Sequence, residues 1–241
     1  MLPKINENKS FTTIELPSGK SVGIHPWRVK EEKELLFALE GLDEASETYQ
    51  QNAKIQMFEF VKKCVDKPEM FDVLSNTDIL KTVMELRKLS KGDTIEYEYK
   101  CPHCGTPTSD TISITKHSKT KKFDGSPVKL NETLIFNIKE VPAKVLMNLF
   151  EKYMTSSNKF NYYYLLNSIE SVVVDGEISA GFTIDELIEF IDQLTPNQYE
   201  ELQKVLQDKL ADVSLDRSYK CIKCKKDVEV LFGDLYDFLI F

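Results

Sequence analysis

Residues 94–115 read TIEYEYKCPHCGTPTSDTISIT, in which one strand-like segment enters a Cys-x-x-Cys turn and a second strand-like segment leaves it. Apolar and charged side chains alternate before the turn, with the period of two that is typical of a half-buried strand. Residues 215–231 repeat this design as LDRSYKCIKCKKDVEVL, and both stretches contain Tyr-Lys-Cys-x-x-Cys. The sequence therefore predicts two cysteine-bearing β-hairpins that match each other locally.

The two turns together offer four thiolates, which is a ligand set of structural zinc sites. Zinc accepts four sulfurs in a tetrahedron, each about 2.3 Å from the ion. We expect a structural Zn²⁺ ion bound by Cys101, Cys104, Cys221 and Cys224. Residues 105–220 separate the two pairs, so the expected hairpins join as a split zinc ribbon with a helical insertion. His103 lies inside the first turn, and the sequence leaves open whether it replaces a cysteine or forms a hydrogen bond nearby.

Two other roles for these cysteines fit the sequence less well. A closed shell of four sulfurs has no free position for water, which argues against a catalytic zinc. A thioredoxin-like thiol oxidoreductase has a helix after its Cys-x-x-Cys motif, whereas both pairs here lie between strands. Cys64, the fifth cysteine, has no thiol neighbour in the sequence and is expected in the core. This cysteine usage suits a reducing compartment better than a disulfide framework.

The remaining sequence changes between helical and strand-like periods, so we predict an α+β fold. An N-terminal β-hairpin is expected within 12–27, because Pro17 and Gly19 suit a tight turn between two strand-like runs. A helical middle follows, and another short hairpin is expected at Asp175-Gly176. Start and stop signals predict helices at 29–41, 46–64 and 76–93. Two more helices are expected to begin at Pro142 and at Lys159, and two others after capping boxes at Thr183 and Thr195.

A polar stretch divides the chain into two parts. Residues 116–131 read KHSKTKKFDGSPVKLN, and this density of lysine and polar residues is typical of an exposed loop or linker. We predict a first part at 1–115, which contains the N-terminal hairpin, helices and the first zinc-knuckle hairpin. The second part, 132–241, contains further helices and the second zinc-knuckle hairpin.

Composition and charge limit the classes of function. The 241 residues carry 31 Lys+Arg against 39 Asp+Glu, and the net charge of −8 argues against a nucleic-acid coat. Lysines nevertheless crowd the knuckles, and they either contact nucleic acid, as in a zinc-ribbon regulator, or offset the charge of the metal site. The acidic balance favours the second interpretation. No apolar stretch approaches the ~18 residues of a membrane span, and residues 1–10 lack the apolar core of a signal peptide.

The sequence also lacks the motifs of a reaction centre. Its histidines are His25, His103 and His117, and it contains no glycine-rich phosphate loop, nucleophile elbow or HExxH motif. We therefore expect no enzymatic activity and no small-molecule substrate. Bulky side chains at Tyr162–Tyr164 and at the terminal Phe238–Phe241 suit contacts with other proteins, although a core position is equally consistent for the terminal residues.

A family resemblance extends over most of the chain and is strongest in the first 40 residues. The segments Ile14–Lys20, reading IELPSGK, and 26–36, reading PWRVKEEKELL, resemble baseplate hub proteins of T-even-type contractile-tailed phages. Asp78–Asp93, the first cysteine turn, the late helix and the second cysteine pair are similar to later parts of that family and occur in the same order. Residues 116–180 contribute little to the resemblance.

The resemblance implies a non-enzymatic structural or assembly component of the tail baseplate hub. Its expected partners are other phage tail or baseplate hub proteins, and self-association into a homo-oligomer stays open. Assembly would take place in the host cytoplasm, and the protein would then either enter the virion tail baseplate or leave after assembly. The zinc prediction rests on this sequence alone, since family members need not keep both cysteine pairs.

Overall fold

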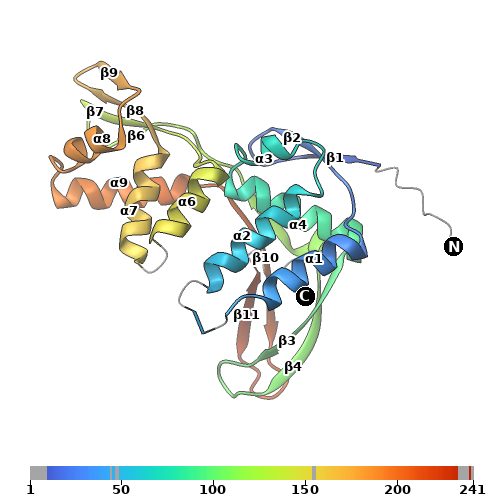
Figure 1. Cartoon of the computed structure of the whole chain (residues 1–241). Coiled ribbons are helices and arrows are strands. Elements are labelled where there is room, and N and C mark those ends of the chain that lie inside the picture. The colour runs from blue at the N-terminus through green and yellow to red at the C-terminus, as the bar shows by residue number, and fades with distance from the viewer. Residues whose placement is uncertain (1–9, 44, 47–48, 154–155, 233–238, 240–241) are drawn as a thin grey trace.

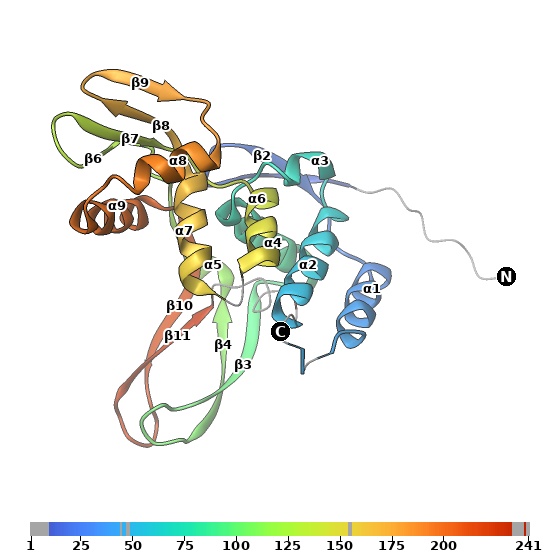
Figure 2. The ribbon, with the colours of Figure 1, turned by 60° about the vertical axis from the view of Figure 1, so that its left-hand side comes forward.

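The computed structural model describes residues 10–43, 45–46, 49–153, 156–232 and 239. Helices and short antiparallel sheets are mixed along the chain, as the sequence predicts (Figure 1). The buried apolar residues form two large clusters, and two long hairpins project side by side from the body (Figures 1 and 2). Within the described ranges, every helix falls short of the length and apolar character that crossing a bilayer requires.

The predicted N-terminal hairpin is confirmed and packs on the first core. β1 (Thr12–Glu15) pairs antiparallel with β2 (Ser21–Ile24), and the turn between them contains Gly19 at φ +83°. The helices that follow are α1 (Val29–Glu40), α2 (Tyr49–Lys62) and α3 (Pro68–Phe71). α1 ends at the C-cap Gly41, as predicted. α3 was not predicted, because a helix of a single turn is too short to show a hydrophobic period.

The longest helix of the first core is α4 (Asn76–Lys91), whose apolar face is buried except for Leu89, which is 42% exposed. Its N-cap is Ser75, whose hydroxyl accepts a hydrogen bond from the Asp78 N–H at 3.2 Å. The Asp78 carboxylate in turn accepts from the Ser75 N–H at 3.3 Å, which completes a capping box. The cap therefore lies one residue before the predicted 76–78 signal. The second Asp78 oxygen accepts from the Ser18 N–H at 3.0 Å and ties the β1–β2 turn to this helix.

Both cysteine-bearing hairpins are packed into the first core at the end away from their turns. β3 (Thr94–Lys100) pairs with β4 (Pro107–Ser113), and β10 (Asp212–Lys220) pairs with β11 (Asp227–Phe232). The four strands place six buried residues in that core: Ile95, Tyr97, Ile112, Val213, Leu215 and Phe232. β4 is followed directly by α5 (Ile114–His117), so the predicted return strand at 111–115 begins and ends earlier than expected.

The second core joins a four-stranded antiparallel sheet to three helices. The sheet order is β6 (Val128–Lys129), β7 (Leu134–Ile138), β8 (Ile169–Val174) and β9 (Glu177–Ala180). The helices of this core are α7 (Ser157–Ser168), α8 (Ile184–Ile191) and α9 (Pro196–Lys209). α6 (Ala143–Tyr153) contacts α2, α4 and α7 and so lies between the two cores. The predicted Asp175-Gly176 hairpin and both capping boxes are confirmed.

Residues 116–131, predicted as a loop or linker, contain paired strands, and that prediction needs correction. β5 (Ser118–Lys121) pairs antiparallel with β10, and β6 pairs with β7. β10 comes from near the other end of the chain, so the local polarity of 116–131 could not reveal this pairing. The domain boundaries at 1–115 and 132–241 stay a prediction.

The two predicted groups of bulky contact residues differ in how much of them the structure describes. Of Phe238–Phe241, only Leu239 lies within the described residues, and it is buried in the first core. Tyr162–Tyr164 are partly buried and make ring contacts within the fold. The ring of Tyr163 stacks on that of Tyr153, with the ring centroids 4.4 Å apart. The ring of Tyr162 is tilted against that of Tyr199, with the centroids 6.2 Å apart.

Candidate metal centre

The structure brings all four predicted cysteines together in the turns of the two projecting hairpins. Their Sγ atoms lie within 4.8 Å of one another. The Sγ atoms of Cys101 and Cys224, and those of Cys104 and Cys221, are 3.7 Å apart. Sulfurs bound about 2.3 Å from a tetrahedral zinc ion are separated by about 3.8 Å, whereas the two sulfurs of a disulfide lie about 2.05 Å apart. The cluster therefore fits a four-sulfur metal site better than a disulfide.

The two turns share one backbone conformation, which directs both cysteines of each turn to the same point. The Cys101 N–H donates to the Thr106 carbonyl at 3.0 Å, and the Gly105 N–H donates to the Cys101 carbonyl at 2.8 Å. The second turn repeats both hydrogen bonds at 2.9 Å, with Lys226 and Lys225 in place of Thr106 and Gly105. Gly105 adopts φ +69° and Lys225 adopts φ +61°, so both turns have left-handed backbone at the equivalent position.

The cysteines form a small buried cluster that is separate from both large cores. Cys101 and Cys221 are 2% and 1% exposed and pack against Val228, while the second cysteine of each pair is partly exposed. Tyr99 and Tyr219 each stand two residues before a cysteine pair, and their ring centroids are 4.5 Å apart. These equivalent tyrosines join the two hairpins directly behind the sulfurs.

The electrostatics of the cluster favour a bound cation. The hydroxyl of Thr106 lies 3.2 Å from the Cys104 sulfur, and its hydroxyl and backbone N–H hydrogen bonds lower the pKa of that thiol to about 6. The backbone N–H of Lys226 lowers the pKa of Cys224, but burial and the neighbouring sulfurs outweigh it and raise that pKa to about 11. Four adjacent thiols cannot all ionise near neutral pH because each thiolate repels the next. A divalent metal ion would remove this repulsion.

His103 lies on the surface beside the cluster. Its Nε2 is 3.1 Å from the carbonyl oxygen of Asp227 and donates to it when Nε2 carries the proton. This contact joins the first turn to the second hairpin. Of the two roles that the sequence leaves open for His103, the hydrogen bond is the one that the geometry shows.

The lysines that crowd the knuckles in the sequence separate into two groups in the structure. Those at the ends of the hairpins are all exposed: Lys100, Lys220, Lys223, Lys225 and Lys226. One of them, Lys220, pairs with Asp227 at 3.0 Å. On β5, Lys119 pairs with Asp216 at 2.5 Å and Lys121 donates to the Asp208 carbonyl at 2.5 Å. The β5 lysines therefore attach β5 to β10 and to the end of α9, and only the first group lies near the cysteines.

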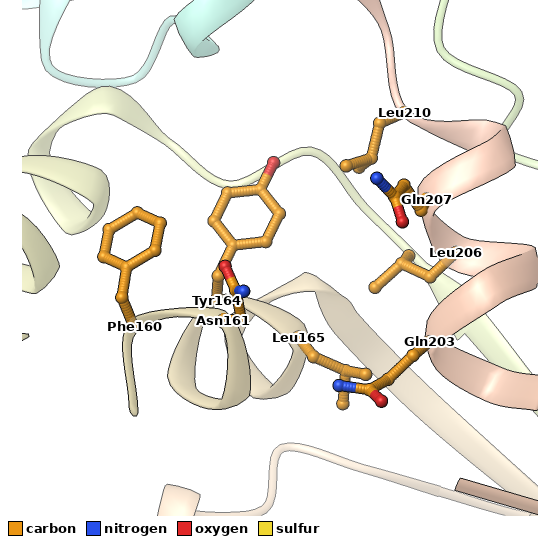
Figure 3. Close-up of a pocket in the computed structure, with 8 residues that line it drawn as sticks. All are labelled: Phe160, Asn161, Tyr164, Leu165, Gln203, Leu206, Gln207 and Leu210. Atoms are coloured by element: carbon orange, nitrogen blue, oxygen red, sulfur yellow. The ribbon is translucent and has the colours of Figure 1, made fainter. Parts of the chain in front are cut away.

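A cavity lies between α7 and α9 (Figure 3). It has a volume of about 420 Å³ and is lined by aromatic, leucine and amide side chains: Phe160, Asn161, Tyr164, Leu165, Gln203, Leu206, Gln207 and Leu210. Burial raises the pKa of Tyr164 to about 12, so its phenol stays neutral at physiological pH. The side chains that line this cavity are therefore uncharged at that pH.

The ring nitrogens of the other two histidines, His25 and His117, lie within hydrogen-bond distance of backbone carbonyl oxygens. The ring nitrogens of His25 lie 3.0 Å from the Pro26 carbonyl and 3.1 Å from the Lys63 carbonyl. His117 Nδ1 lies 2.9 Å from the Ser113 carbonyl. Within the part of the chain that the structure describes, the four cysteines are the one group of His, Cys, Asp or Glu that could hold a metal ion.

The roles of two residues at the site were not predicted from the sequence. Thr106 has no motif that marks it, although it follows the glycine that ends the first turn. Lys225 occupies the left-handed position that Gly105 fills in the first turn, and only an alignment of the two turns identifies it. The four cysteines themselves were found because their spacing is a local signal.

Comparison with known proteins identifies one family. A family model described as T4 bacteriophage base plate protein matches residues 8–240. No curated protein and no solved structure matches the chain.

Proposed function

Because this chain belongs to the T4 bacteriophage base plate protein family, over residues 8–240, we propose that it is a non-enzymatic structural or assembly component of the central baseplate hub. The extent of the family match is the observation that carries this proposal. Other phage tail and hub proteins are the proposed partners, and the host cytoplasm during assembly and then the virion tail baseplate are the proposed locations.

The second part of the proposal is that Zn²⁺ stabilises the protein as a split zinc ribbon. The proposed ligands are Cys101, Cys104, Cys221 and Cys224, which the hairpins bring within 4.8 Å of one another. Zinc fits this donor set because thiolates prefer soft or borderline metals and a closed tetrahedral shell suits a structural ion. Such an ion would join residues 101–104 to residues 221–224 and so fix the two hairpins as one unit.

The third part concerns the organisation of the chain. We retain 1–115 and 132–241 as the two parts, with 116–131 as the crossing between them. Burial supports this division in part, since the second core is built from residues between Val128 and Leu206. The last two strands nevertheless return to the first core. The segment between β5 and β10 thus has the character of an insertion into the ribbon.

The hub assignment is tested by locating the protein during infection. Baseplates and their assembly intermediates are purified from infected cells, and hub and wedge fractions are analysed by mass spectrometry. We expect the chain in the hub fraction, at a fixed ratio to the other hub proteins. Its presence in wedges alone, or its absence from every intermediate, would contradict a hub role.

The zinc assignment is tested by metal analysis of the purified protein. We expect about one zinc per chain, and its loss in the Cys104→Ser plus Cys224→Ser variant. Cys64→Ala is the matched control, because Cys64 is buried in the first core and should leave the zinc content unchanged. Reversible disulfides without bound metal would instead support thiol redox chemistry.

A further inference from the structure

The two cysteine-bearing hairpins, β3–β4 and β10–β11, together form an arm that projects from the body. The end of this arm presents an exposed surface that the metal site itself does not require. We call this surface the arm tip and define it by the exposed residues of the two turns: Pro102, His103, Ile222, Lys223, Lys225 and Lys226. The cysteines between them point inward to the sulfur cluster. The arm tip is therefore the outward side of the same turns.

The arm tip carries a local excess of positive charge in an acidic protein. Lys223, Lys225 and Lys226 lie within four consecutive residues, in a chain whose net charge is −8. Adding Lys100 and Lys220, five lysines face a single aspartate, Asp227, at this end of the arm. A zinc ion bound by four thiolates has two negative charges, which these lysines more than offset. Charge compensation alone does not account for all of them.

An exposed apolar side chain lies among these lysines. Ile222 is 67% exposed, and it stands between Cys221 and Lys223 in the second turn. The equivalent position in the first turn is Pro102, so the turn conformation does not require isoleucine. A large exposed apolar group in a lysine-rich turn suits an interface anchor, whose burial contributes most when its surroundings are also desolvated.

The arm tip is held in place before any partner binds. The hairpins are joined by the Tyr99–Tyr219 ring contact, by the hydrogen bond between His103 and Asp227, and by the sulfur cluster. Little conformational freedom of the backbone would be lost on association, which favours binding by a small surface.

We propose that the arm tip docks on an acidic surface of a neighbouring baseplate protein, with Ile222 in an apolar pocket at the centre of the contact. This inference rests on the proposed baseplate function. Charge complementarity identifies the partner surface as acidic, because a cluster of exposed lysines favours carboxylate-rich patches. The matching pocket must be apolar because burial of Ile222 against polar groups would leave those groups without hydrogen bonds.

A protein surface fits this site better than nucleic acid. The strands behind the turns carry exposed carboxylates at Glu96, Glu98 and Glu229. A nucleic-acid backbone that extended beyond the arm tip would meet this negative charge and be repelled. The exposed arm tip also has no Phe, Tyr or Trp on which bases could stack.

The test places a photocrosslinking amino acid at position 222 of the full-length protein during phage infection. We expect one major crosslinked protein from the baseplate, whose crosslinked peptide has a net negative charge. Ile178 is the matched control position, because it is 71% exposed but lies on β9, far from the arm in the chain. The same product from position 178 would overturn the proposal.

Charge reversal supplies the second readout. Lys223→Glu and Lys226→Glu together should lower the yield of the position-222 product by about tenfold. Lys225 is kept because it holds the left-handed position of the second turn, and zinc content is measured for each variant. The control reverses two exposed lysines elsewhere, Lys129 and Lys204, and should preserve the yield. An unchanged yield after arm-tip reversal overturns the proposal.

The remaining outcomes separate this inference from the proposed function. A crosslink to nucleic acid, a crosslink to a second copy of this chain, or no product would each overturn the docking proposal. The hub assignment would survive any of these results if the chain is still found in the hub fraction. Absence from every baseplate fraction would instead contradict the proposed function itself.

Discussion

At the scale of single residues, the two cysteine turns are one structure built from different side chains. Gly105 and Lys225 occupy the same left-handed position, at φ +69° and φ +61°. Left-handed backbone costs about 1–2 kcal/mol for a residue with a Cβ atom, whereas glycine adopts it readily. The second turn is therefore strained at a position where the first is not.

Exchanging these residue types should change stability in opposite directions. Lys225→Gly should stabilise the zinc-loaded protein by about 0.5–1 kcal/mol, because relief of strain exceeds the added flexibility of the unfolded chain. Gly105→Ala should destabilise it by about 1 kcal/mol, and the backbone alone would be responsible, since nothing lies within 4 Å of an added Cβ. Chemical denaturation measures both changes.

Lys225→Ala separates backbone strain from charge in this experiment. Alanine keeps the left-handed penalty and removes the lysine, so the free energy of unfolding should stay near that of the original protein. A gain equal to that of Lys225→Gly would show that charge, and not backbone strain, sets the stability of the turn.

The residues of the candidate site differ in how far the sequence reveals them. The cysteines were predicted because a Cys-x-x-Cys spacing is a local signal with a direct chemical reason. The convergence of two pairs separated by residues 105–220 was a geometric hypothesis, and the Sγ distances bear it out. Thr106 could not be predicted, because its hydroxyl bond to Cys104 depends on the path of the backbone after the turn.

At the scale of helices and strands, local signals were predicted well and pairings between distant segments were not. The capping boxes at Thr183 and Thr195 were predicted because each joins residues three apart. β5 was missed because its hydrogen bonds come from β10. The polarity of Ser118–Lys121, which suggested a loop, reflects a strand whose side chains are largely exposed.

The N-caps provide a matched test of these local interactions. Ser75 caps α4 with its side chain, whereas Ser156 occupies the N-cap of α7 without a side-chain cap hydrogen bond. Ser75→Ala should therefore lower the free energy of unfolding by about 1 kcal/mol or somewhat more, while Ser156→Ala should change it by less than about 0.5 kcal/mol. Urea denaturation of both variants makes the comparison, and equal losses would contradict the assigned role of the Ser75 hydroxyl.

Glu140, between β7 and α6, should make stability depend on pH. Burial raises its pKa, as does the nearby Asp78 carboxylate, while a hydrogen bond with Ser75 and the charge of Lys20 oppose the rise. The folded protein therefore holds the Glu140 proton more tightly than the unfolded chain. The stability that this group contributes is fully present below its ordinary pKa of 4.5 and is lost as the pH rises through the raised value.

Replacing this carboxyl group should remove that dependence. Glu140→Gln should raise the thermal midpoint at pH 7.5 relative to the original protein, and the difference should shrink toward pH 5. Thermal unfolding in zinc-containing buffer at several pH values measures it. A difference that stays constant with pH would show that packing, and not ionisation, causes the effect.

At the scale of the whole molecule, the chain passes from the first core to the second after β5 and returns to the first core at β10. The outgoing and returning segments are joined by the pairing of β5 with β10 and by an ion pair between Lys209 and Asp124 at 2.7 Å. The second core is therefore held at its base without help from the cysteines. The cysteine cluster closes the opposite end of the same ribbon, where neither large core reaches.

Metal removal should therefore loosen the arm and leave the second core intact. We expect a chelator to abolish amide protection in the turn-proximal halves of β3, β4, β10 and β11, because their small buried cluster consists of the cysteines, Tyr219 and Val228. Protection in β7 and β8 should persist, since Phe136 and Val172 belong to the second core. Hydrogen exchange with mass spectrometry measures both regions, and Cys104→Ser plus Cys224→Ser should reproduce the pattern without chelator. If protection in β7 and β8 disappears as well, the metal stabilises the whole molecule, and the β5–β10 crossing does not hold the second core independently.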